Sequence, residues 1–243
     1  MNKKNFIDVC LSPELLHLYS LEDTIVVVTD ILRATSCMVT ALASGVKAII
    51  PIREVGDCMK MKNLGHLIAA ERDGKKIEGF DLGNSPFSYQ EKHLQGKTIA
   101  LTTTNGTQAI KLSERAEEIL VGAFLNLETI AKYLNDKEKN VLVVCAGWKG
   151  KVNMEDTLFA GALVEQLDNF AAANDSALMA KILYQESKNN LLGVLMQCSH
   201  VQRLKNLGIE KDIEFCLQHN IYKVLPKMQQ GALIAAELLQ LST

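Results

Sequence analysis

Short runs of apolar, largely β-branched residues recur along the first two thirds of the chain, and amphipathic segments separate them. The clearest runs occupy residues 24–28, 48–52, 98–101, 119–121 and 141–145. Runs this short, without polar alternation, are typical of strands buried on both faces of a sheet. Strands that alternate with helices build an α/β fold. The sequence therefore predicts a mixed sheet with helices packed on both faces, in a single α/β domain over residues 1–243.

Helical periodicity and stop signals place the intervening helices. The expected helices span residues 34–44, 54–64, 107–115 and 127–134. The first two end at Gly45 and Gly65, and glycine is a natural C-terminal stop. From Glu155 onward helical spacing dominates, through residues 178–187 and 201–207. The C-terminal third is therefore predicted to be helical.

Two segments need other interpretations. Asp73-Gly74 is a hairpin-type turn between extended residues 67–70 and 76–77. The segment from 224 to 241 fits a strand and a helix equally, so its structure stays open.

Charge and cysteine usage limit the partners and the compartment. Lys plus Arg number 26 and Asp plus Glu number 28, whereas nucleic-acid binding demands a basic face. No window approaches ~20 consecutive apolar residues, so no membrane span is expected. The N-terminus lacks the apolar core of a signal peptide, and six cysteines include no C-x-x-C pair. We expect a cytoplasmic protein that binds neither nucleic acid nor membrane.

Polar side chains gather at two points where a predicted strand ends and a helix begins. One loop carries Asp30, Arg33, Thr35 and Ser36, and the other spans residues 104–107. Ligands of open α/β sheets bind in the crevice at the carboxyl ends of the strands, where helix N-termini favour anions. The alternative is plain helix capping by Thr, Ser and Asn. Two such loops, one with both an acid and an arginine, favour an anion-binding site.

Three further segments carry polar side chains suited to a site. Residues 71–74 and 79–86 form a polar, glycine-punctuated stretch, in which glycine would let backbone approach a ligand and a surface loop is the alternative. Asn153 and Asp156 have the spacing of a capping box, while Glu155 and Asp156 could instead supply oxygen ligands to a hard cation. His200 precedes a helix, where it is either structural or functional.

In this order and spacing, the segments resemble the 2-phosphosulfolactate phosphatase family. The resemblance covers residues 25 to 226 and rests on residues 29–36, 71–74, 79–86, 103–107, 145–147, 155–156, 160–161 and 199–200. It implies an α/β fold and a Mg²⁺-dependent phosphatase of coenzyme M biosynthesis. The implied reaction converts (R)-2-phospho-3-sulfolactate and water into (R)-3-sulfolactate and phosphate. The partner would be this small anionic ester, and a homo-oligomer is compatible with the sequence.

The resemblance and the charge of this substrate assign roles to the candidate residues. Asp30, Arg33 and His200 are expected to be catalytic, and Asp30, Asp81, Glu155 and Asp156 are expected to hold Mg²⁺. The expected substrate-binding residues are Thr35, Ser36, Arg72, Asn84, Ser85, Thr104, Asn105, Gly106 and Thr107. The substrate brings about four negative charges, which require a metal, converging basic side chains and helix N-termini.

Several alternatives stay open. The attacking group is either a metal-aligned water or a carboxylate that forms a phospho-aspartyl intermediate. Arg33 either clamps an anionic group of the substrate or forms a buried pair with Asp30 that fixes the loop. The substrate is either phosphosulfolactate or another phosphorylated hydroxy acid, and a non-catalytic anion sensor on the same scaffold is the third reading. Residues 148–153 and the segment after 226 have no expected role.

Overall fold

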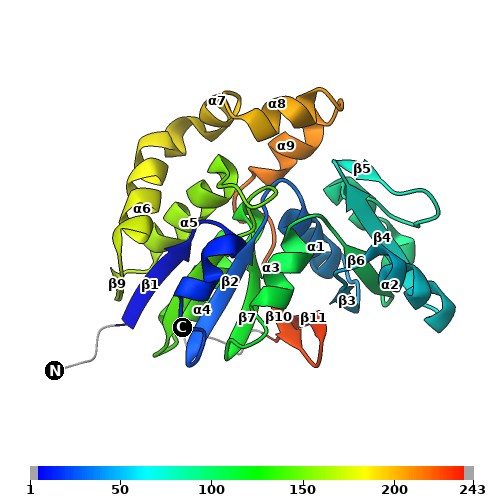
Figure 1. Ribbon diagram of the computed structural model, residues 1–243, viewed down its shortest axis with the longest axis horizontal. Helices are drawn as coiled ribbons and strands as arrows, with labels where there is room; N and C mark the ends of the chain where they lie inside the picture. The colour runs from blue at the N-terminus through cyan, green and yellow to red at the C-terminus, as the bar shows by residue number, and fades with distance from the viewer. Residues whose placement is uncertain (1–4, 238–243) are drawn as a thin grey trace.

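The computed structural model describes residues 5–237, which form an α/β fold on one mixed sheet (Figure 1). The strand order is β5-β4-β6-β3-β11-β10-β7-β2-β8-β1-β9. The bounds are β1 Asn5–Cys10, β2 Thr24–Thr29, β3 Ala48–Pro51, β4 Leu67–Arg72, β5 Lys75–Lys76, β6 Thr98–Thr102, β7 Glu118–Gly122, β8 Asn140–Cys145, β9 Phe170–Ala172, β10 Leu225–Gln229 and β11 Ala232–Ala236. The apolar runs in the sequence correspond to β2, β3, β6, β7 and β8, which confirms the predicted fold class.

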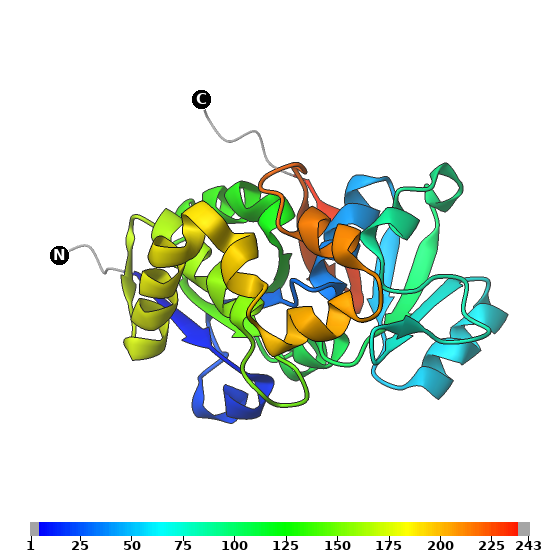
Figure 2. The same cartoon turned by 90° about the horizontal axis from the view of Figure 1, so that it is seen from above.

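Helices cover both faces of the sheet. The α-helices are α1 Ala34–Ala43, α2 Val55–Lys60, α3 Gly106–Leu112, α4 Leu127–Asn135, α5 Met154–Gln166, α6 Asp175–Ser187, α7 Leu191–Leu195, α8 Ser199–Lys205 and α9 Glu210–Cys216. The 3₁₀ helices are η1 Pro13–Leu18, η2 Met61–Leu64, η3 Pro86–Tyr89, η4 Lys92–Leu94, η5 Phe124–Asn126 and η6 Lys188–Asn190. Figure 2 shows α1, α4 and α5 on one face and α2 and α3 on the other. The run from α5 to α9 confirms the predicted helical C-terminal segment.

The sheet consists of two parallel groups of strands joined by a hairpin. Strands β7, β2, β8, β1 and β9 form one parallel group, and β4, β6 and β3 form the other. The antiparallel pair β10–β11 lies between them, bonded to β7 on one side and to β3 on the other. The ambiguous segment is therefore a hairpin up to Ala236, and residues after 237 lie outside the described range.

Two tight turns follow the same backbone pattern. Asp73 and Gly74 join β4 to the short antiparallel strand β5, with φ of 52° and 85°. Gln230 and Gly231 join β10 to β11, with φ of 50° and 81°. Two consecutive positive φ angles match the twist of a hairpin, and glycine at the second position adopts them without strain. The predicted hairpin turn at Asp73-Gly74 is thus confirmed.

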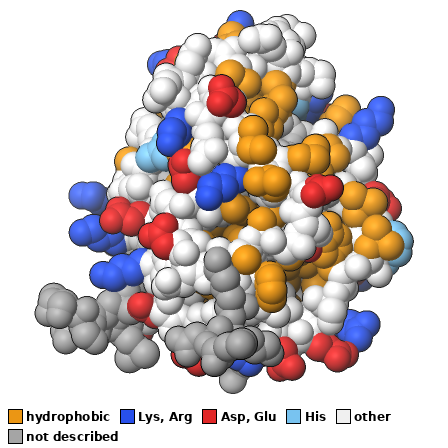
Figure 3. Space-filling model, turned by 90° about the vertical axis from the view of Figure 1, so that its left-hand side faces the viewer, with side chains coloured by type: hydrophobic (Ala, Val, Ile, Leu, Met, Phe, Trp, Pro, Cys, Tyr) orange, Lys and Arg blue, Asp and Glu red, His pale blue; other side chains and the backbone are white. Residues whose placement is uncertain are grey.

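Helix α6 covers the edge of the sheet next to β9 and packs tightly on α5. A Cβ atom on Gly161 of α5 would lie only 2.0 Å from the carbonyl oxygen of Ala180, so this close approach requires glycine. The outer side of α6 leaves Leu178, Met179 and Ile182 about half exposed. Figure 3 shows hydrophobic side chains gathered on this side of the molecule. None of these three side chains lines the pocket described below.

Helices α8 and α9 lie beyond the ends of β2 and β8, at the top of the molecule in Figure 1. They close the edge of the sheet at which the chain leaves β2 and β8, so side chains from the C-terminal third meet loops from the first half. Within residues 5–237, none of the helices combines the length and apolar character that spanning a bilayer requires.

Candidate active site

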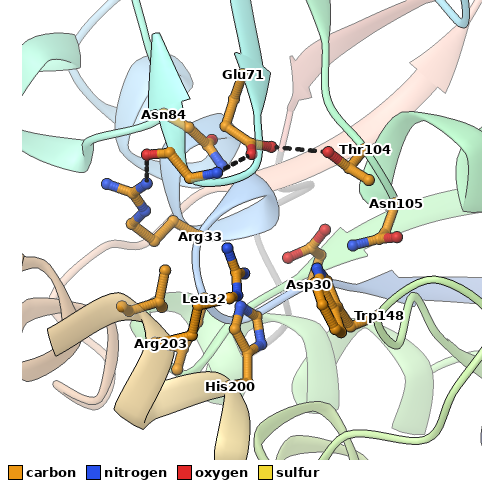
Figure 4. A pocket seen from close by; sticks show the side chains of 12 residues that line it. Asp30, Leu32, Arg33, Glu71, Asn84, Thr104, Asn105, Trp148, His200 and Arg203 are labelled. Carbon is orange, nitrogen blue, oxygen red and sulfur yellow. Dashed lines mark hydrogen bonds between the residues drawn. The ribbon is translucent and has the colours of Figure 1, made fainter. Parts of the chain in front are cut away.

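A charged pocket lies where the carboxyl ends of the two parallel groups of strands meet (Figure 4). Its lining comes from five parts of the chain and comprises Asp30, Leu32, Arg33, Glu71, Gly74, Asn84, Thr104, Asn105, Trp148, His200, Arg203 and Leu204. The loops after β2, β6 and β8 supply three walls, the β4–β5 hairpin and the chain after it supply the fourth, and α8 closes the pocket. Six of the residues predicted from the sequence to be catalytic, metal-holding or substrate-binding line it: Asp30, Arg33, Asn84, Thr104, Asn105 and His200.

Asp30 follows β2 and lies at the floor of this pocket. A Cβ atom on Gly106 would come within 2.9 Å of Asp30 Oδ2 and within 2.8 Å of the Ala34 side chain. Gly106 is thus the residue whose missing side chain makes room for the carboxylate. Burial raises the pKa of Asp30 to about 7; nearby His200 opposes this shift and Glu71 adds to it. An acid of this kind can change its protonation state near neutral pH.

The loop that carries Asp30 is held by its own hydroxyl groups. Thr35 Oγ1 accepts a hydrogen bond of 3.0 Å from the Asp30 amide, and Ser36 Oγ donates one of 2.8 Å to the Ile31 carbonyl. Both hydroxyl residues are fully buried and neither lines the pocket. Thr35 and Ser36, which we expected to bind substrate, therefore satisfy the backbone at the start of α1, as capping residues do.

Arg33 is engaged by a buried acid from the far end of the chain. Its Nη1 lies 2.5 Å from Asp212 Oδ2 of α9, and its Nη2 donates to the Gly74 carbonyl at 2.8 Å. Ser85 Oγ donates to the other oxygen of Asp212 at 2.9 Å. The charge of Arg33 is thus compensated by Asp212, and Ser85 supports that pair. The partner of Arg33 is Asp212 and not Asp30, a pairing across 179 positions that no local sequence pattern indicates.

Glu155 and His200 form a second buried pair, beside Asp30. Nδ1 of His200 lies 2.5 Å from Glu155 Oε1, which also accepts a hydrogen bond from Asn153 Nδ2 at 3.0 Å. Glu155 is fully buried at the start of α5. A carboxylate on one ring nitrogen fixes the orientation of a histidine and leaves the other nitrogen for chemistry. Asn153 makes no side-chain capping hydrogen bond at the start of α5, so the capping box, one of the two interpretations of this segment, is absent.

Asp156 joins the ends of two strands. Its two oxygens accept hydrogen bonds from the amides of Ile31 at 2.8 Å and Gly147 at 3.0 Å. Burial, followed by the charges of Asp30 and Glu155, raises the pKa of Asp156 well above its usual range. Asp156 therefore supports the loops after β2 and β8 from behind, and it does not line the pocket.

Two other predicted residues face elsewhere. Asp81 accepts a hydrogen bond of 2.9 Å from the Ile68 amide and pairs with Lys62 at 3.3 Å. Arg72 donates to the Glu71 carbonyl at 2.7 Å and to Thr102 Oγ1 at 3.0 Å. Neither belongs to the pocket lining. Of the four carboxylates expected to hold Mg²⁺, Asp30 alone lines the pocket.

Glu71 is the second carboxylate of the pocket, and it is not among the residues predicted from the sequence to be catalytic, metal-holding or substrate-binding. Its oxygens accept hydrogen bonds from the Gly74 amide at 2.5 Å and from Thr104 Oγ1 at 3.3 Å (Figure 4). A signal for it was present, because Glu71 directly follows the apolar run 67–70 just as Asp30 follows the run 24–28. Asn84 lines the same side, and its buried Oδ1 has no hydrogen-bond partner among the described residues.

The loop after β6 divides its residues between the pocket and the scaffold. Thr104 and Asn105 line the pocket, and Asn105 Oδ1 accepts a hydrogen bond of 3.2 Å from the Lys149 amide. Thr107 is buried, and its amide and hydroxyl both bond to Thr103, at 3.2 Å and 3.1 Å. Thr107 therefore stabilises the loop from inside, while Thr104 and Asn105 remain available to a ligand.

Trp148 and Arg203 also line the pocket, and neither is among the site residues predicted from the sequence. The Trp148 ring lies beside His200, with ring centroids 6.3 Å apart and an interplanar angle of 26°. The Arg203 guanidinium lies 4.8 Å from the centroid of the same ring. One sequence feature could have pointed to Trp148: it is the single tryptophan of the chain and follows the apolar run 141–145, where a strand ends.

The arrangement of carboxylates limits how a cation could bind. Among residues 5–237, no three His, Cys, Asp or Glu side chains are grouped so as to hold a metal ion. The pocket does contain the oxygen atoms of Asp30 and Glu71 and the unpartnered Oδ1 of Asn84. Mg²⁺ commonly takes one or two carboxylates and completes its shell with water and substrate phosphate. Two carboxylates and one amide oxygen are therefore compatible with Mg²⁺, which does not require a site built from protein ligands alone.

Fold and pocket together are those of an α/β enzyme for small charged compounds. A family model described as 2-phosphosulpholactate phosphatase matches residues 10–231. A Thermotoga petrophila protein named "Probable 2-phosphosulfolactate phosphatase" is 43% identical over 211 residues, which are 87% of this chain and 92% of that protein. The chain belongs to the 2-phosphosulfolactate phosphatase family and is a phosphatase of that family, as the sequence resemblance implied.

Two more distant relatives carry the same name. The Caldanaerobacter subterraneus protein is 41% identical and is covered over 90% of its length, against 87% of this chain. The Clostridium acetobutylicum protein is 35% identical and is covered over 99% of its length, against 94% of this chain. The similarity therefore extends through all the segments that line the pocket.

Proposed function

We propose that this chain hydrolyses (R)-2-phospho-3-sulfolactate to (R)-3-sulfolactate and phosphate with the help of Mg²⁺. The observation that carries the proposal is the placement of Asp30 beside His200 in one pocket, with His200 oriented by Glu155. Phosphate-ester hydrolysis needs charge neutralisation and alignment of the attacking oxygen more than covalent chemistry. The pocket supplies groups for both tasks. The names of the similar proteins and the family model support the choice of substrate.

Asp30 and Glu71 are the residues that would hold Mg²⁺, with Asn84 Oδ1 as a neutral donor. This set differs from the one expected from the sequence, because Glu155 and Asp156 are occupied by His200 and by backbone amides. When bound, the cation would neutralise charge on the phosphate oxygens. Without it, the carboxylates of Asp30 and Glu71 would repel the substrate.

Asp30 and His200 divide the proton transfers. One oxygen of Asp30 accepts a proton from the water that attacks phosphorus. The bond from phosphorus to the C2 oxygen breaks, and the ring nitrogen of His200 that does not face Glu155 donates a proton to that leaving oxygen. Arg33 positions the loop through Asp212 and Gly74, and Asp30 as a nucleophile remains the alternative for the first step.

Phosphate release by the purified protein tests this proposal. The substrates would be (R)-2-phospho-3-sulfolactate and a panel of other phosphorylated hydroxy acids, each with Mg²⁺ and with a chelator. We expect turnover of phosphosulfolactate that disappears in chelator and returns with Mg²⁺, and less than about 1% of it in His200→Gln, as loss of a general acid predicts. Faster hydrolysis of another ester on the panel would show that this ester, and not phosphosulfolactate, is the preferred substrate. Absence of turnover on the whole panel would favour a non-catalytic anion sensor.

A further inference from the structure

Arg203 is the arginine of the pocket that forms no ion pair within residues 5–237. It lies on α8, three positions after His200, so both side chains project from one face of that helix. Figure 4 shows them rising from α8 towards the pocket, opposite Glu71 and Thr104. None of the ion pairs within residues 5–237, counted to 4.0 Å, involves Arg203. Its buried Nε has no hydrogen-bond partner in that part of the chain either.

Trp148 holds the guanidinium of Arg203 in place. The guanidinium carbon lies 4.8 Å from the centroid of the indole ring, within the range of a cation–π contact. On another side, a Cβ atom on Gly74 would lie 3.5 Å from Arg203 Nη1, so the guanidinium borders the β4–β5 turn. A planar group fixed between a ring and a turn loses little conformational entropy when it binds a ligand.

The contrast with Arg33 shows which arginine is available to a substrate. Both terminal nitrogens of Arg33 are used, by Asp212 and by the Gly74 carbonyl, and the side chain is 4% exposed. Asp73, which adjoins Gly74 in the β4–β5 turn, is exposed and pairs with Lys149 at 3.0 Å. Arg203 therefore brings into the pocket a guanidinium that is in no ion pair within residues 5–237, and Arg33 does not.

We infer that Arg203, held by Trp148, binds the sulfonate group of the substrate and makes the pocket selective for esters that carry one. This inference rests on the proposed function. A sulfonate keeps its negative charge at all physiological pH values and offers oxygen acceptors only, so it requires donors such as the guanidinium fork. With the phosphate at Asp30 and His200, Arg203 of the same lining would be within reach of a group on a carbon next to C2, and the truncated esters below distinguish the sulfonate on C3 from the carboxylate on C1.

Esters that each lack one anionic group can show which group Arg203 binds. Phosphosulfolactate carries phosphate, carboxylate and sulfonate; 2-phospholactate lacks the sulfonate, and the phosphate ester of 2-hydroxyethanesulfonate lacks the carboxylate. We expect Arg203→Met to lower kcat/KM about 10- to 100-fold for the two sulfonates, as loss of a charged hydrogen bond predicts, and to change 2-phospholactate less than threefold. Equal losses on all three esters, or losses confined to the two carboxylates, would overturn the inference.

Two further variants check that the effect is specific. Lys205→Met removes a charge from the same helix outside the pocket lining, and it should leave the ratio of kcat/KM for phosphosulfolactate and 2-phospholactate unchanged. Trp148→Phe should keep most of the selectivity, and Trp148→Leu should lose it in part. If Arg203→Met fails to fold, Arg203→Lys provides the test, because its single ammonium cannot reproduce the fork and should lower the same ratio.

A binding measurement separates this inference from the proposed function. Calorimetry would compare (R)-3-sulfolactate with lactate, on wild type and on Arg203→Met, and needs no turnover. Tighter binding of sulfolactate by wild type, weakened by Arg203→Met but not by Lys205→Met, supports the sulfonate site even if no ester is hydrolysed. Hydrolysis of phosphosulfolactate with unchanged sulfolactate affinity in Arg203→Met would reject the sulfonate site and leave the proposed function standing.

Discussion

Nδ1 of His200 lies 2.5 Å from Oε1 of Glu155, although the two residues are 45 positions apart. Glu155 is fully buried, and its second oxygen has no hydrogen-bond partner among the described residues. The carboxylate therefore acts mainly on the histidine, whose orientation it sets. Glu155, which we expected to hold a metal, contacts His200 instead, and we propose that it positions this histidine.

Glu155→Gln should lower kcat by about 10- to 100-fold, the usual cost of removing a residue that orients a functional histidine, with KM nearly unchanged. His200→Gln should cost more, and the double variant should be no slower than His200→Gln. Steady-state kinetics on the three variants measures this. Multiplicative losses in the double variant would show that Glu155 acts separately from His200.

Breaking the Arg33–Asp212 pair should destabilise the fold. Arg33→Met leaves Asp212 buried without its partner, which costs about 3–5 kcal/mol in comparable pairs, whereas replacement of both charges by apolar side chains costs little. Denaturant unfolding of Arg33→Met, Asp212→Leu and the double variant measures this, and the double variant should recover most of the lost stability. Should Arg33→Met retain full stability and lose only substrate affinity, Arg33 is a clamp for the substrate after all.

Asp30→Asn should make the metal-free protein more stable at alkaline pH. Because burial raises the pKa of Asp30 from 3.8 to about 7, the folded state binds more protons than the unfolded state between these values. Ionisation of Asp30 therefore lowers stability as pH rises from 3.8 to 7, and the full penalty applies above pH 7. In chelator, the variant should melt above wild type at pH 8.5 and close to it at pH 4.

Magnesium should reverse that order if Asp30 helps to hold it. Mg²⁺ should raise the melting temperature of wild type at pH 8.5 and leave Asp30→Asn unchanged, since a ligand stabilises only a protein that binds it. Equal stabilisation of both proteins would exclude Asp30 from the cation site. The measurement needs no substrate and is independent of turnover.

Gly106→Ala should impair the site through sterics alone. The added methyl group would come within 2.9 Å of Asp30 Oδ2 and 2.8 Å of the Ala34 side chain, so Asp30 must move. We expect at least a tenfold loss of kcat and a destabilisation of about 1–3 kcal/mol, as overpacking predicts. Gly56→Ala on α2 is the matched control, because its Cβ would meet nothing within 4 Å. A fully active Gly106→Ala would show that the position of Asp30 tolerates displacement.

The strands and the starts of the polar loops follow from local patterns in the sequence. Buried parallel strands are continuous apolar runs in the sequence, so the strands at residues 24–28 and 141–145 can be predicted without tertiary information. Asp30 and Thr104 follow such runs, and strand ends of an open sheet are where ligands bind. The segment up to Ala236 stayed ambiguous because its strands are specified by pairing with β3 and β7, which come from elsewhere in the chain.

Which polar residues face the pocket depends on contacts between distant parts of the chain. Thr35, Ser36 and Thr107 read as ligand-binding residues, yet their hydroxyl groups satisfy nearby backbone, and burial leaves them no other use. Arg33 directly precedes α1, and Arg203 lies in the last turn of α8. Within residues 5–237 the fold gives Arg33 an acid partner, Asp212, and places Arg203 in no ion pair. The difference arises because a buried charge is compensated by whichever opposite charge the fold brings near it, and sequence distance does not encode that.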